Sequence, residues 1–429
     1  MRGKFHVDFD IDGIKGVFKV SGRLHWNAFC ILSAFIKREL EKNKTSSLII
    51  DLIRLDGADQ DGVLPLIALL DRYREAGLPV VVRMPRAHEL RAIFNNHNWS
   101  HYLDKSHKKI QRQNTRSTGV LEFNDFSSLN NIINKAMHIA IKGGTFKNGA
   151  LQSLEWSLNE ITDNVVRHSG NSHGWFEVTW QADGSIKFTV CDNGVGIPAT
   201  MRAAFPELSD DADAIHRSVE KGVTSNSEGQ GNGLAGTLEI THQCDGLLII
   251  NSYKGHLHSL KGRVKSEPAC VPYMGTFVHF SMPDDVEIDL TKAIWGYESL
   301  GYAQLKYDMN ESDDVVIRLR EEESNFGNRP TGLRVRNLIQ NTVTQFEGRR
   351  IVIDFNEVGL ISSSFADEVF GKLALSWGIL NFTRILKIIN ATNLVENIIN
   401  KAIMQRMAQS FSSMQSGATQ MEGIDSPDF

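Results

Sequence analysis

The chain has 429 residues, of which 41% are hydrophobic and 23% charged, a balance typical of globular domains that bury cores. At roughly 150 residues per domain, this length predicts about three domains. The net charge of -5 argues against a protein that coats nucleic acid. The four cysteines form no C-x-x-C pair, which argues against a disulfide framework and a zinc site and favours a cytoplasmic location. The most apolar stretch, residues 62–70, is too short to span a bilayer.

The first predicted domain, residues 1–104, is a small α/β unit. Residues 47–52 (SLIIDL) are typical of a buried strand, 63–73 have helical spacing, and a second strand begins at Val80. Strand, helix and strand at this spacing predict a parallel pair with a crossover helix. The polar, basic and aperiodic segment that follows predicts a linker over residues 105–129.

The central domain is predicted over residues 130–285. Leucines, an isoleucine and a valine recur at spacings of three and four from Leu151 to Val165, which predicts an amphipathic helix. Residues 175–180 and 186–190 flank an Asp-Gly turn and are typical of two strands. Residues 247–250 and 276–280 predict two more strands.

A connector over residues 286–311 leads to a third α/β domain, predicted over 312–407. Strands and helices are expected there in alternation, at 315–319, 333–346, 351–355, 365–375 and 385–389. The last segment, 408–429, is rich in Ser, Gln, Met and Gly, which predicts a disordered tail.

The first motif with chemical content lies on the predicted central helix. Glu160, Asn164 and His168 are four residues apart, so they share one helix face. A neutral amide oxygen suits Mg²⁺, and a carboxylate can orient or deprotonate a nucleophile. By itself this face also fits an ordinary polar stripe turned to solvent.

The second motif, Cys191 to Gly196 (CDNGVG), follows a strand directly. A carboxylate at a strand end accepts hydrogen bonds from an exocyclic amine, and glycines let backbone approach a flat ring. Asp192 with Gly194 and Gly196 therefore suits a base-binding pocket. A simple Asn-Gly turn is the alternative.

The third motif is the glycine-rich run from Gly229 to Gly236 (GQGNGLAG), which precedes a helical pattern. Backbone amides of such a turn, together with a helix N-terminus, form a phosphate site. The run also fits the dinucleotide fingerprint G-x-G-x-x-G, but that fingerprint needs a strand directly before it, and here a loop is predicted. The P-loop pattern G-x-x-x-x-G-K-[ST] does not occur.

The order and spacing of these motifs resemble the GHKL superfamily, the Bergerat ATP-binding fold of gyrase, histidine kinases and MutL, over about 140 residues. The resemblance implies bound ATP and Mg²⁺. It also implies roles for individual residues: Glu160 as general base, Asn164 as Mg²⁺ ligand, Asp192 as the acid that reads adenine, Gly194 and Gly196 as glycines of that box, Gly231, Gly233 and Leu234 as the last box, and Thr276 as a hydroxyl near the adenine.

The same resemblance places the lid that covers ATP at about residues 199–230. Arg217 and Lys221 are candidates for a γ-phosphate contact from this lid, although surface solubility is the commoner reason for such side chains. A sensor histidine kinase also needs a phosphorylatable histidine. The segment His88 to Arg91 (HELR) is superficially similar to that box but lacks the later proline and the two long preceding helices.

The last domain resembles STAS-like domains, the type found in anti-sigma-factor antagonists. The resemblance rests on the strand 351–355 (IVIDF) and the run Ile361 to Asp367 (ISSSFAD). It implies Ser363 as a candidate phosphoacceptor at a helix start, where added negative charge is favoured, and a plain helix cap is the alternative. Ser362 replaces the family's aspartate. Residues 1–104 resemble a second, diverged STAS-like unit without a hydroxyl residue in the equivalent loop, which implies a docking module.

The expected fold class is therefore α/β: a Bergerat GHKL sandwich flanked by two small STAS-like domains. The expected function is an ATP- and Mg²⁺-dependent signalling ATPase or serine/threonine kinase whose nucleotide state controls protein partners of the STAS-like domains. The alternative is a non-catalytic, nucleotide-switched dimerisation scaffold, a mode of action that would suit stress or phage defence. Homodimer formation is compatible with both hypotheses, whereas binding to a membrane is not expected. A clamp on DNA is the third option, against which the acidic balance argues.

Overall fold

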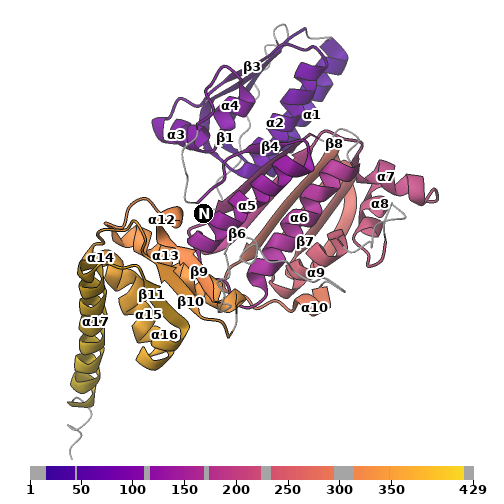
Figure 1. Cartoon of the computed structure of the whole chain (residues 1–429). Coiled ribbons are helices and arrows are strands. Elements are labelled where there is room, and N and C mark those ends of the chain that lie inside the picture. Colours follow the sequence, from indigo (N-terminus) through magenta and orange to yellow (C-terminus); the bar gives the residue numbers. More distant parts are fainter. Residues whose placement is uncertain are drawn as a thin grey trace, which may run out of the picture. The chain divides into compact units, whose positions relative to one another are not determined.

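The computed structural model describes residues 16–43, 46–110, 116–168, 173–223, 233–293, 314–346 and 348–419 (Figure 1). Contacts divide the chain into two compact units. The first consists of residues 1–140 and 149–299, and the second of residues 141–148 and 300–429. The predicted α/β class is confirmed: an antiparallel central sheet is accompanied by a parallel sheet near each end of the chain.

The first unit begins with an N-terminal module built on a three-stranded parallel sheet in the order β1-β2-β3. Its strands are β1 (Val17–Leu24), β2 (Leu48–Ala58) and β3 (Val80–Arg83). Its helices are α1 (Trp26–Asn43), α2 (Gln60–Glu75), α3 (His88–Asn96) and α4 (Trp99–Leu103). The predicted parallel pair is β2 and β3, whereas β1 and α1 were not predicted.

The five-stranded antiparallel sheet of the first unit has the order β4-β5-β6-β8-β7. The strands are β4 (Leu121–Phe123), β5 (Gly174–Trp180), β6 (Ser185–Asp192), β7 (Leu247–Leu260) and β8 (Arg263–Pro283). β4 and the start of α5 (Phe126–Gly143) lie inside the range predicted as linker. The apolar residues Leu121 and Phe123 explain the strand, because Phe123 is buried against the sheet.

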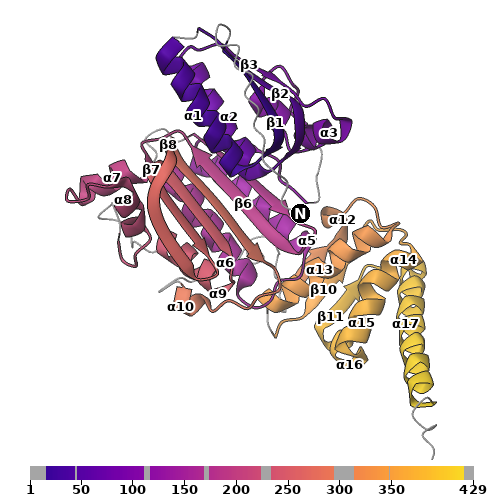
Figure 2. The ribbon, with the colours of Figure 1, turned by 180° about the vertical axis from the view of Figure 1, so that it is seen from behind.

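One face of this sheet is covered by α5, α6 (Ala150–His168) and α9 (Gly233–Gln243), as the front and back views show (Figures 1 and 2). Phe188 of β6 and Phe280 of β8 stack on that face with ring centroids 4.8 Å apart. α7 (Gly196–Ala204) and α8 (Asp211–Ser218) follow β6, and the short α10 (Leu290–Ala293) follows β8.

The opposite face of the same sheet is buried in part, where α1 and α2 of the N-terminal module pack on it. Trp175, Cys191 and Phe277 form a cross-strand row there and share one apolar core with residues of α1 and α2. All seven residues of β5 are consequently buried. The alternation in β6 predicts a half-buried strand, and its other face is covered as well in the second half of the strand, at Thr189 and Cys191.

The second unit contains a three-stranded parallel sheet in the order β11-β10-β9. The strands are β9 (Val315–Arg318), β10 (Ile351–Asp354) and β11 (Leu386–Ile389). The helices are α12 (Leu319–Glu322), α13 (Arg329–Gln345), α14 (Ser363–Ala366), the π-helical turn η1 (Asp367–Gly371), α15 (Lys372–Trp377), α16 (Ile379–Ile385) and α17 (Asn393–Thr419).

Two polar clusters hold this unit together. The side chain of Asn341 donates to the carbonyl oxygens of Ile141 and Gly144 and accepts from the amide of Phe146, which ties residues 141–148 to α13. Elsewhere, Glu368 is almost fully buried and its carboxylate is surrounded by three cationic side chains, from Arg329, Arg336 and Lys372.

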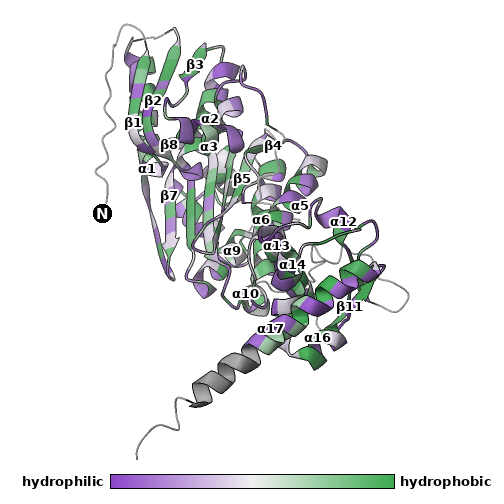
Figure 3. Cartoon of the chain, turned by 90° about the vertical axis from the view of Figure 1, so that its left-hand side faces the viewer, coloured by the Kyte–Doolittle hydropathy of each residue, from purple (hydrophilic) through white to green (hydrophobic). Residues whose placement is uncertain are grey.

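The last helix, α17, carries both apolar and polar bands over its described side chains (Figure 3). Val395 and Ile399 are buried, whereas Leu394 and Met404 are exposed. The helix continues through residues 408–419, which the sequence analysis places in the disordered tail, and 420–429 lie outside the described residues. Among the described helices, none is both long and apolar enough to cross a membrane.

Candidate functional site

The carboxylate at the end of β6 is the best-defined element of the candidate site. Asp192 is 3% exposed, and its Oδ1 accepts a hydrogen bond of 2.7 Å from the amide of Gly194. The amide and hydroxyl of Thr276 on β8 lie near this carboxylate and favour its charged form through hydrogen bonding. Burial is the largest influence and raises the pKa of Asp192 to about 7, although these hydrogen bonds oppose the rise. The structure therefore brings Asp192, Gly194 and Thr276 together.

Glycines allow the neighbouring backbone segments to approach closely. Gly196 has a φ of 73°, and a methyl group on it would lie 2.6 Å from the hydroxyl oxygen of Ser252. Gly275 has a φ of 103°, and a methyl group on it would lie 2.1 Å from the carbonyl oxygen of Asp192. Both positions require glycine, because the left-handed conformation and the contact each exclude a side chain.

Glu160 and Asn164 lie one turn apart on α6, and both are half-buried. A methyl group on Gly233, the first residue of α9, would meet Glu160 Oε2 at 2.4 Å, so the carboxylate lies against the start of that helix. Burial raises the pKa of Glu160 above its ordinary value; nearby Asp163 adds to the rise and Arg167 opposes it. One turn further along α9, Gly236 packs against the ring of Trp156.

This geometry agrees with the family comparisons. Residues 150–286 match the model described as "Histidine kinase-, DNA gyrase B-, and HSP90-like ATPase". Residues 150–286 form a GHKL-type ATP-binding domain. Residues 331–396 match the model of a STAS-like domain of unknown function, so the C-terminal domain is STAS-like.

Comparisons over the whole chain add little to this assignment. None of the curated proteins matches the chain. A solved structure titled "Crystal structure of ShkA full-length in complex with AMPPNP" is similar over 89% of this chain and 72% of that one, with 12% identity and a TM-score of 0.21. That likeness is too weak to support an argument about fold or activity.

The segment expected to form the ATP lid, residues 199–230, is described as far as residue 223. Lys221 is exposed. The guanidinium of Arg217 pairs with Glu220 and lies over the ring of Phe205, with 5.5 Å between the guanidinium carbon and the ring centroid. Gly231 lies outside the described residues, whereas Leu234 is half-buried on α9.

The STAS-like domain places its three consecutive serines at the start of α14. Ser362 is the N-cap, and its hydroxyl accepts a hydrogen bond of 3.0 Å from the amide of Phe365. Ser363 is the first helical residue and is exposed, while the hydroxyl of Ser364 lies 2.9 Å from that of Ser362. The capping role therefore belongs to Ser362, which leaves the hydroxyl of Ser363 accessible.

Two residues of the GHKL domain were not singled out by the sequence analysis. Ser252 on β7 accepts a hydrogen bond from Ile197 and donates one to the carbonyl oxygen of Gly275. Asn193, between Asp192 and Gly194, donates through its side chain to the carbonyl oxygen of Ala68 in α2. Asn193 could have been noticed from its place inside the motif, but Ser252 lies in a segment without a motif.

Proposed function

We propose that the chain is an ATP- and Mg²⁺-dependent signalling ATPase or serine/threonine kinase, in which the nucleotide state of the GHKL domain controls protein partners of the STAS-like domains. The observation that carries this proposal is the buried Asp192 carboxylate, fixed by Gly194 and Thr276 at a strand end. An ionised carboxylate in that position accepts a hydrogen bond from the exocyclic amine of adenine. Glycines in the adjoining loop and strand let the backbone close around this carboxylate.

The residues of α6 suit a magnesium ion that arrives with the nucleotide. No cluster of three or more His, Cys, Asp or Glu side chains that could hold a metal occurs in the described ranges. A single amide oxygen, from Asn164, fits Mg²⁺ because this ion takes most of its ligands from phosphates and water. When bound, the ion would neutralise phosphate charge.

Glu160 is proposed as the general base. Its raised pKa improves proton acceptance near neutral pH, because a base works best when its pKa approaches the working pH. Its position against the start of α9 supports this role, since the amides at a helix N-terminus favour anions such as phosphate. The nucleophile would be water in an ATPase, or a serine hydroxyl in a kinase.

Titration calorimetry with ATP and Mg²⁺ tests the pocket. Asp192→Asn removes the anionic acceptor and should weaken binding by at least ten-fold, about 1.4 kcal/mol. Asp183→Asn is the matched control, because this aspartate lies in the exposed turn before β6. Equal ATP affinity of wild type and Asp192→Asn would contradict the assignment.

The phosphoacceptor proposal concerns Ser363. Its exposed position at the start of the segment α14–η1–α15 supports it, because a helix N-terminus stabilises a phosphate. Incubation with γ-labelled ATP should label the wild type and leave Ser363→Ala unlabelled, with Ser364→Ala as the neighbouring control. Full labelling of Ser363→Ala would exclude Ser363, and turnover without any labelled protein would favour simple hydrolysis.

The N-terminal module is proposed as a second STAS-like unit. Its parallel three-stranded sheet, with the strands in chain order, supports this proposal because the C-terminal domain has the same arrangement. No hydroxyl residue occurs in the segment from Asp56 to Gly62. The module would therefore not accept a phosphoryl group from this site.

A further inference from the structure

The N-terminal module is joined to the GHKL domain by polar contacts as well as by an apolar core. Trp26 at the start of α1 stacks on Phe277, with 4.1 Å between ring centroids and 25° between ring planes. Phe277 directly follows Thr276, one of the residues proposed to hold the adenine. The apolar contact between the module and the sheet thus lies next to a residue of the proposed adenine site.

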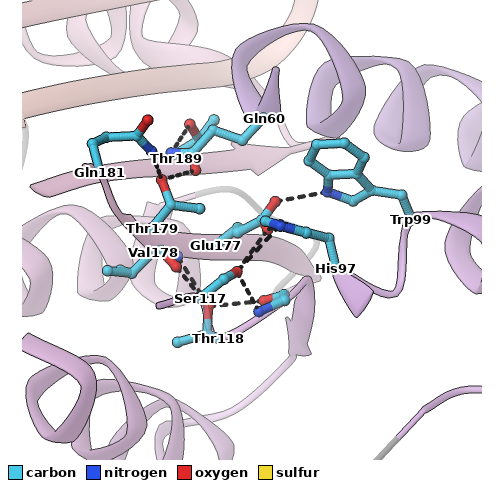
Figure 4. Close-up of polar contacts among 11 residues, drawn as sticks. Gln60, His97, Trp99, Ser117, Thr118, Glu177, Val178, Thr179, Gln181 and Thr189 are labelled. Atoms are coloured by element: carbon cyan, nitrogen blue, oxygen red, sulfur yellow. Dashed lines mark hydrogen bonds and ion pairs between the residues drawn. The ribbon is translucent and has the colours of Figure 1, made fainter. Parts of the chain in front are cut away.

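A buried hydrogen-bond network fixes how α2 lies on the sheet (Figure 4). The amide nitrogen of Gln60 donates to the hydroxyl of Thr189 over 3.0 Å, and its amide oxygen accepts from the hydroxyl of Thr179 over 2.8 Å. Thr189 also bonds to His279 Nδ1 over 2.8 Å. These four side chains are all buried, so displacement of Gln60 would leave polar groups without partners, which is costly.

A second buried network involves the fully buried carboxylate of Glu177 (Figure 4). It accepts from Trp99 Nε1 over 2.8 Å and from the hydroxyl of Ser117 over 3.1 Å, and it contacts His97 Nδ1 at 2.5 Å. Ser117 contacts the same ring nitrogen of His97. In a catalytic triad, the acid and the nucleophile bond to opposite ring nitrogens of the histidine. Here both contact the same nitrogen, so the arrangement is not a triad. Its role is structural: it fixes the position of the module on the sheet.

Helix α2 also reaches the nucleotide loop itself. The side-chain amide of Asn193 donates a hydrogen bond of 2.9 Å to the carbonyl oxygen of Ala68. At the preceding residue, the hydroxyl of Tyr273 donates to the carbonyl oxygen of Asp192 over 3.4 Å, and Tyr273 belongs to the core shared with Trp26. The chain at Asp192 and Asn193 is therefore held by two side chains, those of Tyr273 and Asn193, that contact residues of the module.

We propose that the N-terminal module positions the nucleotide loop of residues 192–196 through Asn193 and α2, and so sets the affinity of the GHKL domain for ATP. This inference rests on the proposed function, because it concerns the same pocket. Coupling between sites is reciprocal, so ATP in turn stabilises the contact between the module and the sheet. Any protein that displaces α2 would lower ATP affinity.

The module-side test is Gln60→Ala, because Gln60 contacts the sheet and not the loop. Gln181→Ala is the matched control: Gln181 donates to the same hydroxyl of Thr179 over 2.9 Å but belongs to the GHKL domain. With the non-hydrolysable analogue adenylyl imidodiphosphate and Mg²⁺, we expect Gln60→Ala to bind about five-fold more weakly or worse and Gln181→Ala to bind as wild type does.

A double-mutant cycle separates positioning from general loss of stability. If the module acts through Asn193, Gln60→Ala should weaken binding much less in an Asn193→Ala background than in the wild type. If the two substitutions acted independently, their losses of binding free energy would add. Additive effects in the cycle, or wild-type affinity of Gln60→Ala, would overturn the inference.

Hydrogen exchange provides a readout without nucleotide. The amides of Gly194 and Ile197 are bonded to Asp192 and to Ser252, and in Gln60→Ala both should exchange several-fold faster than in Gln181→Ala. Unchanged exchange at both amides would overturn the inference even if ATP binds. Faster exchange together with no ATP binding by the wild type would uphold the positioning of the loop and reject the proposed function instead.

Discussion

The hydroxyl of Ser252 donates a hydrogen bond of 2.7 Å to the carbonyl oxygen of Gly275. The same hydroxyl accepts a hydrogen bond of 2.9 Å from the amide of Ile197. One fully buried side chain on β7 thus joins the loop that follows Asp192 to the irregular stretch of β8 that precedes Thr276. Both segments carry residues that we propose to hold the adenine.

Replacing Ser252 with alanine should therefore loosen the pocket. The change removes two hydrogen bonds and leaves the partner groups without partners, which costs about 1–3 kcal/mol. We expect a lower free energy of unfolding in urea and weaker ATP binding. Ser259→Ala is a matched control, because Ser259 is also fully buried on β7 but its hydroxyl has no hydrogen-bond partner among the described residues. Equal effects of both changes would contradict the proposed link.

The pKa of about 7 for Asp192 predicts pH-dependent nucleotide binding. The ionised carboxylate accepts a hydrogen bond from the adenine amine. The affinity for ATP should therefore fall as the pH drops through 7, by about ten-fold between pH 8 and pH 6. Calorimetry across this range measures the change. Asp192→Asn cannot ionise and serves as the control for ionisation of the ATP phosphates. A parallel pH dependence in both proteins would show that Asp192 is not responsible.

Much of the GHKL domain could be predicted from sequence, because its information is local. The spacing from Leu151 to Val165 defines a helix that exists as α6, and Asp192 lies at the end of a strand as its motif predicts. The packing of the N-terminal module could not be predicted in this way. Thr189 and Glu177 are polar residues on strand faces that are normally solvated, and their burial depends on Gln60 and Trp99, which are distant in sequence.

The serines of the STAS-like domain show a second limit of prediction from sequence. The sequence places Ser363 at a helix start, and the structure agrees, but a serine cap and an accessible serine are indistinguishable in a run of three. The hydrogen bond from Phe365 identifies Ser362 as the cap. Backbone geometry decides this point, since a cap must lie just outside the helical conformation.

Asp61 on α2 predicts a pH dependence of stability. Burial, with a smaller contribution from Asp59, raises its pKa to about 6. The folded protein therefore holds this proton more tightly than the unfolded chain, so the contribution of Asp61 to stability is greatest at low pH and is lost as the pH rises through about 4 to 6. Asp61→Asn should stabilise the protein at pH 8 by at most about 3 kcal/mol and have little effect at pH 4.

Urea unfolding of the wild type and of Asp61→Asn at pH 4 and pH 8, monitored by tryptophan fluorescence, measures this difference in stability. Asp56→Asn is the matched control, since Asp56 is exposed on the neighbouring strand β2 and should change stability little at either pH. A stabilisation of Asp61→Asn that is the same at pH 4 and pH 8 would mean that the burial of a charge is not its cause.

Glu160→Gln distinguishes a catalyst from a nucleotide-switched scaffold. If Glu160 is the general base, the amide should abolish turnover while ATP affinity changes little, because a general base acts on the nucleophile rather than on the bound nucleotide. Release of inorganic phosphate and label transfer to protein measure turnover, and calorimetry measures binding. Sedimentation with and without ATP completes the comparison, since a scaffold would change its oligomeric state whether or not turnover occurs.

Asp163→Asn provides a second and more specific test of the same residue. Asp163 raises the pKa of Glu160 through its charge and pairs with Arg167. Removing that charge lowers the pKa of Glu160, so the acidic limb of the pH–rate profile should move to lower pH while turnover persists. An unchanged acidic limb in Asp163→Asn, together with turnover in Glu160→Gln, would show that another group takes the proton.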